Sequence, residues 1–369
     1  MTTTMPVTTR LVSLDVMRGL IMLLLAAESC LLYESLQQLQ LPGIAGAIVQ
    51  QFFHHPWHGL RFWDLVQPAF MTMAGAALYI AYYYKLQKGI SWQQNFKHIA
   101  IRCLKLFLFG TALHCIYAGR LVWELWNVLT QLAFTTLLAY WIIRRAAAFQ
   151  IIFSIVLLLL TEAAYRLVLI PGFNQPFVTG HNFGNWMDTV LMGKTNSDGW
   201  VAINCIPTAA HTIWGVLAGK LLISAGSTSK KIKVLLAAGT VALCAGYLLN
   251  ELGITPIIKR ISTSSFVLVS GGWVLLILTF LYWLIDIKKW NRYAWIFTVV
   301  GMNAIFIYLF FETVGVQWLN ATVAVFVKGA ANMVNLTMPS GNILSALTTL
   351  TIEWALCYFL YKKKLFFKL

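Results

Sequence analysis

Phe-Phe-His-His-Pro-Trp-His-Gly-Leu-Arg-Phe-Trp-Asp-Leu-Val-Gln-Pro-Ala-Phe is the sequence of residues 52–70, around which the chain is organised. Three of the seven histidines, His54, His55 and His58, lie within five residues of one another here. Asp64 follows where a long apolar run has already begun. A carboxylate in an apolar span and histidines beside it are costly in a membrane protein and mark functional sites by default. We therefore look for chemistry in this stretch.

The composition predicts an integral membrane protein. Of the 369 residues 59% are hydrophobic and only 11% are charged, whereas soluble domains carry about 25% charged residues. The net charge of +15 resides in short basic clusters between apolar runs. That pattern is typical of membrane topology and not of a nucleic-acid-binding face. We expect an all-α, polytopic helix bundle in which a single transmembrane domain occupies residues 1–369.

About ten stretches are long and apolar enough to span a membrane, since a span needs roughly 20 mostly apolar residues. These stretches are residues 11–33, 62–84, 98–118, 121–143, 147–170, 202–225, 234–252, 264–285, 294–315 and 343–361. An even number of spans puts both termini on one side. The large majority of the 27 Lys and Arg residues fall at one set of helix ends, so the positive-inside rule predicts that both termini are cytoplasmic.

This topology places the histidine stretch and the longest loop, about residues 171–201, outside. The loop is polar, aromatic and rich in glycine. Its side chains suit a carbohydrate-like ligand better than a lipid tail, and Trp186 is a candidate contact. Structureless loops of this length are usually functional or disordered, and the tryptophan content argues against disorder. We therefore expect the loop to bind substrate.

The histidines permit three roles. A histidine with a pKa near 6.5 can act as general base and take a proton from an amine or hydroxyl that attacks an acyl group. The alternatives are structural histidines that cap a re-entrant loop, and metal ligands, although Pro56 interrupts any helical ligand spacing. Asp64 can orient an imidazole by accepting its N–H, or can form an ion pair with Arg61 three residues earlier.

Other polar residues inside the spans have both an ordinary and a functional interpretation. Asp15 and Arg18 are three residues apart and can pair on one helix face, or Arg18 can face the interior and bind a phosphate. Further interior polar groups can be interhelical hydrogen-bonding residues or line a ligand path: His211, Ser264, Ser265 and Asn303. Glu353 in the last span is isolated, and the sequence gives it no role.

Several ordered segments resemble the heparan-α-glucosaminide N-acetyltransferase family and its bacterial relatives. Residues 10–20, Arg-Leu-Val-Ser-Leu-Asp-Val-Met-Arg-Gly-Leu, are similar to the family's R-L-x-S-L-D-x-x-R-G-L opening. Residues 54–75 resemble its H-x-x-W-x-G-x-x-x-x-D-L-V-x-P-x-F signature. Later segments follow in the right order: residues 206–219, 263–266, 282–286 and 301–304. Two positions depart from the family pattern, Gln131 in place of a common arginine and His58 in place of a common asparagine.

The resemblance implies a membrane-embedded acetyltransferase with acetyl-CoA as donor and an amino sugar or glycan as acceptor. Matching the signature on Trp57, Gly59 and Asp64 makes His54 the catalytic residue, as general base or transient acetyl carrier, with Asp64 orienting it. We expect no metal and no nucleic acid, and leave a homodimer open; the expected location is the bacterial inner membrane. The expected donor-binding residues are Asp15, Arg18, His211, Ser264, Ser265 and Asn303, and the expected acceptor-binding residues are His55, Trp57, His58 and Trp186.

A transporter that moves a sugar fragment without chemistry is the alternative from another class. Ten spans with the interior charges Asp15, Arg18 and Asp64 are equally natural in a transporter. The sequence has no visible inverted repeat and no paired broken helices, which weighs against this alternative. Uptake of labelled amino sugar into proteoliposomes without CoA, undiminished when His54 is replaced, would favour the transporter.

Overall fold

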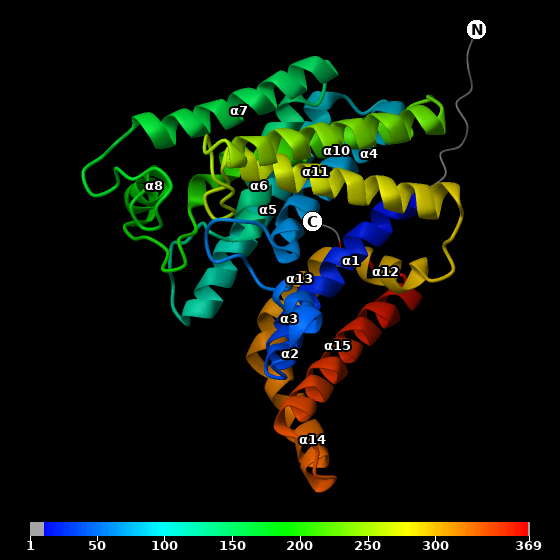
Figure 1. The fold of residues 1–369 in the computed structure, drawn as a ribbon. Coiled ribbons are helices and arrows are strands. Elements are labelled where there is room, and N and C mark those ends of the chain that lie inside the picture. Colours follow the sequence, from blue (N-terminus) through cyan, green and yellow to red (C-terminus); the bar gives the residue numbers. More distant parts are fainter. Residues whose placement is uncertain (1–10, 368–369) are drawn as a thin grey trace. The chain divides into compact units, whose positions relative to one another are not determined.

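The computed structural model describes residues 11–367, and the regular elements in that range are helices. Arg10, the first residue of the family-like opening, lies outside the described residues. The chain forms two compact units (Figure 1). The first unit comprises His55–Leu60 and Asp64–Thr279, and the second comprises residues 11–54, Arg61–Trp63 and residues 280–367.

Helices occupy each of the ten stretches predicted to span the membrane. Eight helices in residues 11–367 are long and apolar enough to cross a bilayer. The first and fourth predicted stretches are not among these eight. The first is α1, Val12–Ser29, which carries three charged residues, and the fourth is the shorter apolar helix α6, Val128–Ile142. The predicted all-α membrane bundle is therefore confirmed, and the chain is an integral membrane protein.

The first unit is built around α9, Cys205–Ile223, which packs against α4, α6 and α7. Small residues bring α9 and α4 into backbone contact: a Cβ on Gly75 would lie 2.0 Å from the carbonyl oxygen of Thr212, and one on Gly215 would lie 2.1 Å from that of Thr72. Such close approach is a common way to pack membrane helices. The helices of this unit are α4 Val66–Gln87, α5 Trp92–Ala118, α6, α7 Ala147–Leu167, α8 Phe183–Met192, α9, α10 Thr228–Glu251 and α11 Ser264–Leu281, together with the 3-10 helix η2 Ala202–Asn204. The last residues of α11 belong to the second unit, because the first unit ends at Thr279.

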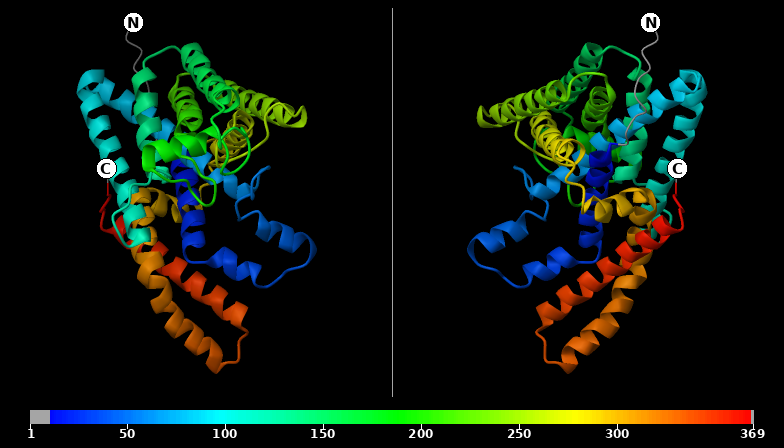
Figure 2. Two further views of the ribbon diagram at one scale, coloured as in Figure 1. Left: turned by 90° about the vertical axis from the view of Figure 1, so that its left-hand side faces the viewer. Right: turned by 90° about the vertical axis from the view of Figure 1, so that its right-hand side faces the viewer.

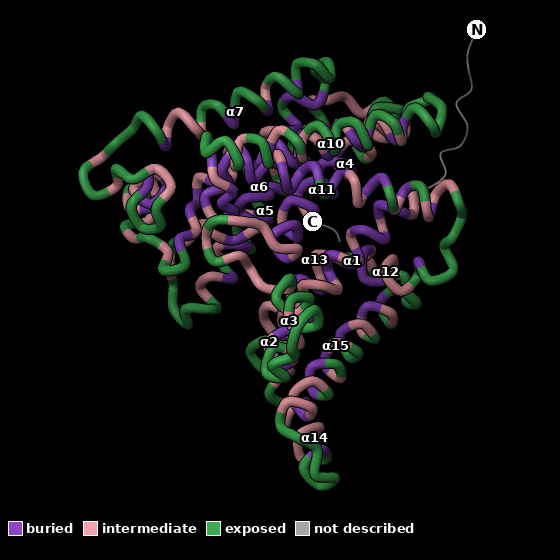
Figure 3. The backbone as a smooth tube through the Cα atoms, in the orientation of Figure 1, coloured by how far each residue is buried: buried purple, intermediate pink, exposed green. Residues whose placement is uncertain are grey.

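The outer helices of the first unit present apolar side chains to their surroundings. Leu159 and Leu160 of α7 and Val241 and Leu248 of α10 are more than half exposed. Figure 3 shows exposed backbone along α7 and α10, whereas α11 is mostly buried. Exposed leucine and valine on helices of this length are expected where the neighbour is lipid.

The second unit is organised on α1 and α12, Ala294–Gly301. Gly19 and Gly301 allow the two helices to meet: a Cβ on Gly19 would lie 1.9 Å from the carbonyl oxygen of Phe297. Asp286 accepts hydrogen bonds from the backbone amides of Val12 and Ser13 at 2.9 and 3.1 Å. A carboxylate at a helix N-terminus satisfies free amides and the helix dipole, so Asp286 fixes the start of α1.

The rest of the second unit differs from the predicted ninth span. The stretch 294–315 is interrupted after Gly301, and a continuous helical run of 30 residues extends instead from Ala304 to Met333. This run returns through α15, and the two form a long helical hairpin (Figure 2). The remaining elements of the unit are α2 Leu32–Gln37, α3 Gly43–Gln50, the 3-10 turn η1 Phe62–Leu65, which continues into the first unit, the π-helices η3 Tyr282–Ile287 and η4 Phe311–Leu319, α13 Ala304–Phe310, α14 Asn320–Met333 and α15 Met338–Lys362.

Candidate functional site

Asp64 forms a buried ion pair in the first unit. Its side chain is fully buried, and the Nζ of Lys259 lies 3.6 Å from its Oδ1. Its Oδ2 accepts a hydrogen bond from the backbone amide of His55 at 3.3 Å. The Lys259 ammonium also lies over the ring of Trp200, 5.4 Å from the centroid. A buried carboxylate persists only with such partners, so Asp64 ties the histidine stretch to the loop that carries Lys259.

Gly59 makes a second link between the histidine stretch and the same loop. Its amide donates to the carbonyl oxygen of Ile257 at 2.8 Å. Its φ is +136°, a region that side chains with a Cβ rarely adopt. A Cβ at this position would lie 2.7 Å from the Nε2 of His55. Glycine is therefore required here, both for the turn and for the space that the His55 ring occupies.

Trp57 joins the histidine stretch to the long loop 171–201. Its indole N–H donates to the carbonyl oxygen of Phe177 at 2.7 Å. A Cβ on Gly199 would lie 2.8 Å from the Trp57 ring, which also packs on the buried cluster around Tyr165 and Ile258. Trp57 thus holds the loop in place, and its predicted contact with an acceptor stays a prediction. His58 is exposed beside it.

The long loop is ordered and contains α8. Trp186 is half-buried on this helix, and its ring packs against Phe183 with centroids 5.7 Å apart. Asp188 is fully buried; its carboxylate accepts from the indole N–H of Trp126 at 2.8 Å and from the amide of Ala202 at 2.9 Å. Burial outweighs these two hydrogen bonds and raises the pKa of Asp188 to about 6.

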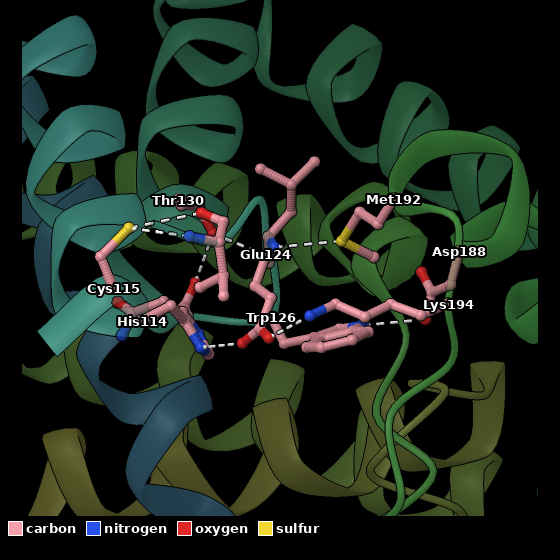
Figure 4. A network of polar contacts seen from close by, with 11 residues as sticks. His114, Cys115, Glu124, Trp126, Thr130, Asp188, Met192 and Lys194 are labelled. Atoms are coloured by element: carbon pink, nitrogen blue, oxygen red, sulfur yellow. Dashed lines mark hydrogen bonds and ion pairs between the residues drawn. The ribbon is translucent and has the colours of Figure 1, made fainter. Parts of the chain in front are cut away.

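A charged network holds the neighbouring loops together (Figure 4). Glu124 accepts one hydrogen bond from the Nζ of Lys194 at 2.5 Å and pairs with the Nδ1 of His114 at 2.7 Å. Burial acts to raise the pKa of Glu124, but the hydrogen bonds and charges of Lys194 and His114 outweigh it, and the pKa is lowered. This network could not be predicted, because its members lie on three separate segments of the chain and form no local motif.

Several buried polar atoms of the first unit have no hydrogen-bond partner in the part of the chain that the structure describes. They are the hydroxyl of Tyr165, both polar atoms of the Asn185 side chain and the Oδ1 of Asn204. The Tyr165 hydroxyl lies against α8, 2.2 Å from where a Cβ on Gly184 would be. Native proteins pair nearly all such groups with protein, water or ligand. This part of the first unit therefore offers donors and acceptors to a polar ligand.

His54 belongs to the second unit. Its carbonyl oxygen accepts a hydrogen bond from Arg61 at 3.1 Å, and its ring packs against the ring of Trp63 with centroids 6.5 Å apart. Trp63 is buried and donates its indole N–H to the carboxylate of Glu28 at 3.1 Å. The position of His54 is therefore fixed through Trp63 by a carboxylate of α1.

The residues predicted to bind the donor fall in both units. In the second unit Arg18 lies 3.8 Å from Asp15 and 3.5 Å from the carbonyl oxygen of Gly301. Asn303 is fully buried and binds the backbone of Leu365 and Phe367. The ion-pair interpretation of Asp15 and Arg18 thus has a geometric basis, while the phosphate interpretation stays a prediction.

In the first unit the predicted donor-binding residues connect helices. His211 of α9 is fully buried, and its Nε2 contacts the carbonyl oxygen of Val267 and the hydroxyl of Ser270 at 3.1 and 3.0 Å. Ser265 donates to the carbonyl oxygen of Pro256, and Ser264 contacts Glu162 of α7. The contacts of His211 and Ser264 match the interhelical interpretation, whereas Ser265 binds the loop that precedes α11. Donor binding by these residues stays a prediction.

Gln131, the departure from the family arginine, is also accounted for locally. It is buried on α6, and its side-chain carbonyl accepts a hydrogen bond from the amide of Gln67 on α4. The neutral amide pair replaces what would otherwise be a buried positive charge beside α4. A family arginine at this position would need an acidic or ligand partner that Gln67 does not supply.

Taken together, the fold and these contacts define a class: a helical integral membrane protein whose histidine stretch is fixed by buried charges and an ordered loop. The family model described as "Heparan-alpha-glucosaminide N-acetyltransferase, catalytic" matches residues 10–252. This range is about two thirds of the chain, and the chain belongs to this family of transmembrane acetyltransferases. No curated protein gives a match. The resembling segments after residue 252 lie beyond the matched range.

Proposed function

We propose that the protein transfers an acetyl group from acetyl-CoA to the amine or hydroxyl of an amino sugar or glycan, at the outer face of the membrane. The observation that carries the proposal is the family match over residues 10–252, which contains His54, Asp64 and the loop 171–201. The unpartnered polar atoms of Tyr165 and Asn185 support a polar acceptor, since they can bind its hydroxyl groups.

His54 is the proposed base. The acceptor nitrogen or oxygen attacks the thioester carbonyl carbon while His54 takes its proton. The carbon–sulfur bond then breaks, and the CoA thiolate recovers a proton from the imidazolium. Asp64 acts as a positioning residue in this proposal, because it holds the backbone amide that follows His54 in the chain. Orientation of the His54 imidazole itself by Asp64 stays a prediction.

The alternative route passes through an acetylated His54. Attack of the imidazole on the thioester would release CoA first, and the acceptor would take the acetyl group in a second step. Rapid mixing with acetyl-CoA alone separates the routes. One equivalent of free thiol per protein before any acceptor is added indicates the acetyl-histidine, and release that begins only with the acceptor indicates the base.

The proposed activity is tested with purified full-length protein, acetyl-CoA and glucosamine. Free thiol and N-acetylated product should appear in equal amounts, the first by a thiol reagent and the second by mass spectrometry. Proteoliposomes loaded with the same protein supply the comparison with transport. Uptake of unmodified glucosamine without CoA, together with no acetylated product, would refute the transferase proposal and favour a transporter.

A further inference from the structure

The second unit contains a cavity of about 650 Å³ whose lining includes none of the residues predicted to act in acetyl transfer. The end of α1, α2, η4, α14 and α15 form its walls, and α2, α14 and α15 gather at this end of the unit (Figure 1). Small-molecule sites usually have volumes of about 300–1,000 Å³. The cavity is therefore large enough for a ligand of several heavy atoms.

The lining of the cavity is acidic. Three carboxylates, from Glu28, Glu34 and Glu312, line it together with one cationic side chain, Lys328. Glu312 lies on the π-helix η4, a geometry that is rare and often found at functional sites. An excess of carboxylates inside a concave, partly apolar wall concentrates the negative potential. The charge of the cavity thus favours a cation.

Three hydrogen-bond acceptors that line the cavity have no donor among the described residues. The Oε2 of Glu34 and the Oδ1 atoms of Asn320 and Asn342 are buried and have no hydrogen-bond partner within residues 11–367. One N–H of each asparagine amide is already used: the Nδ2 of Asn320 donates to the carbonyl oxygen of Ser29, and that of Asn342 donates to the Oε1 of Gln38, each at 2.7 Å. A buried acceptor that is left without a donor is destabilising. A ligand that fits here must supply N–H or O–H donors.

A fourth carboxyl group, that of Glu353, lies close to residues that line the cavity. Glu353 is 1% exposed, and neither of its carboxyl oxygens has a hydrogen-bond partner among the described residues. Its Oε1 and the hydroxyl oxygen of Ser29, which lines the cavity, both lie within 3.6 Å of the Cβ position of Gly315. Thr349, one helical turn earlier on α15, lines the cavity as well. An ionisable side chain inside a membrane helix is a functional site by default.

The charge and the hydrogen-bond acceptors of the cavity favour an organic cation over a metal ion. Residues 11–367 contain no group of three or more His, Cys, Asp and Glu side chains that could hold a metal ion. The volume, the excess of acceptors and the negative charge all match a protonated amine, which carries its charge on a group with three donors. We propose that this cavity binds a small organic cation with a protonated primary amine, through Glu34, Glu312, Asn320 and Asn342.

Two sources share this chemistry, a polyhydroxylated amine such as an amino sugar and a linear polyamine. Titration calorimetry of the purified full-length protein without acetyl-CoA, with glucosamine and with spermidine as ligands, identifies the source. N-acetylglucosamine keeps the ring without the charge, and tetramethylammonium keeps the charge without the donors. At least one amine should bind, and each matched control should bind at least tenfold more weakly than that amine. Equal binding of a control, or no saturable binding of either amine, would overturn the proposal.

Substitutions localise the binding to the cavity. Glu34→Gln and Glu312→Gln remove charge with little change in shape and should each weaken amine binding at least tenfold. Ala324→Phe fills the cavity without a change in charge and should abolish binding. Glu251→Gln makes the same charge change at an exposed position of α10 and should leave the affinity unaltered. Unchanged affinity in both Glu34→Gln and Glu312→Gln would refute the site, even if Ala324→Phe fails to fold. Because no acetyl donor is present, failure of the proposed acetyl transfer would not affect this result.

Discussion

The buried pair of Asp64 and Lys259 allows a quantitative prediction. At an effective dielectric constant of about 20, charges separated by the observed 3.6 Å attract by about 5 kcal/mol. Removal of one partner from a buried pair typically costs 3–5 kcal/mol, because it leaves the other charge uncompensated. We therefore expect Lys259→Met to destabilise the folded protein by about 3–5 kcal/mol. Thermal and denaturant unfolding in detergent, followed by tryptophan fluorescence, measures the loss.

Two further variants separate the energy of the Asp64–Lys259 pair from the general effect of removing a lysine. Lys230→Met removes an exposed lysine from α10 and should change stability by less than about 0.5 kcal/mol. The double variant Asp64→Asn with Lys259→Met removes both charges and should recover much of the loss, so that the cycle gives a coupling energy. If Lys259→Met destabilises no more than Lys230→Met, the pair does not anchor the histidine stretch and the reasoning is refuted.

Three further predictions concern the same sites. Because the pKa of Asp188 is raised to about 6 from an ordinary 3.8, the folded protein binds a proton more readily than the unfolded chain. Acidification from pH 7 to pH 5 should therefore stabilise the wild type by about 1.3 kcal/mol relative to Asp188→Asn. Unfolding measured at both pH values tests this, and equal pH dependence of the two proteins would contradict it. Gly59→Ala should displace the His55 ring and cost roughly 1–3 kcal/mol of stability, and an unfolding temperature equal to that of the wild type would contradict it. Arg18→Ala should raise the KM for acetyl-CoA at least tenfold and leave the KM for the acceptor unchanged, and an unchanged donor KM would restrict Arg18 to its helix ion pair.

Much of the fold could be predicted because membrane helices can be recognised from local composition. Each predicted stretch holds a helix, since an apolar run of spanning length has few other structures available in lipid. The ninth stretch differs for a physical reason. The run after residue 311 is less apolar because it contains Glu312, Gln317 and Asn320. The span predicted from hydropathy therefore ended before the helix does. Two of these polar residues line the cavity of the second unit.

The candidate site could be predicted only in part. Asp64 stood out because a carboxylate in an apolar run is costly, but its partner Lys259 could not be found, since pairing between distant segments is decided by tertiary packing. Glu353 was visible as an isolated charge without a role. Only the fold shows that it lies near Ser29, which lines the acidic cavity of the second unit.

The central claim is that His54 carries the acetyl transfer, and kinetics of His54→Ala test it most directly. Loss of a general base typically lowers the rate by a factor of about 10² to 10⁴. Thiol release from acetyl-CoA in the presence of glucosamine should fall by at least this factor, while the unfolding temperature stays within the range of an exposed control such as His58→Ala. A stable His54→Ala protein with wild-type kcat/KM would contradict the account.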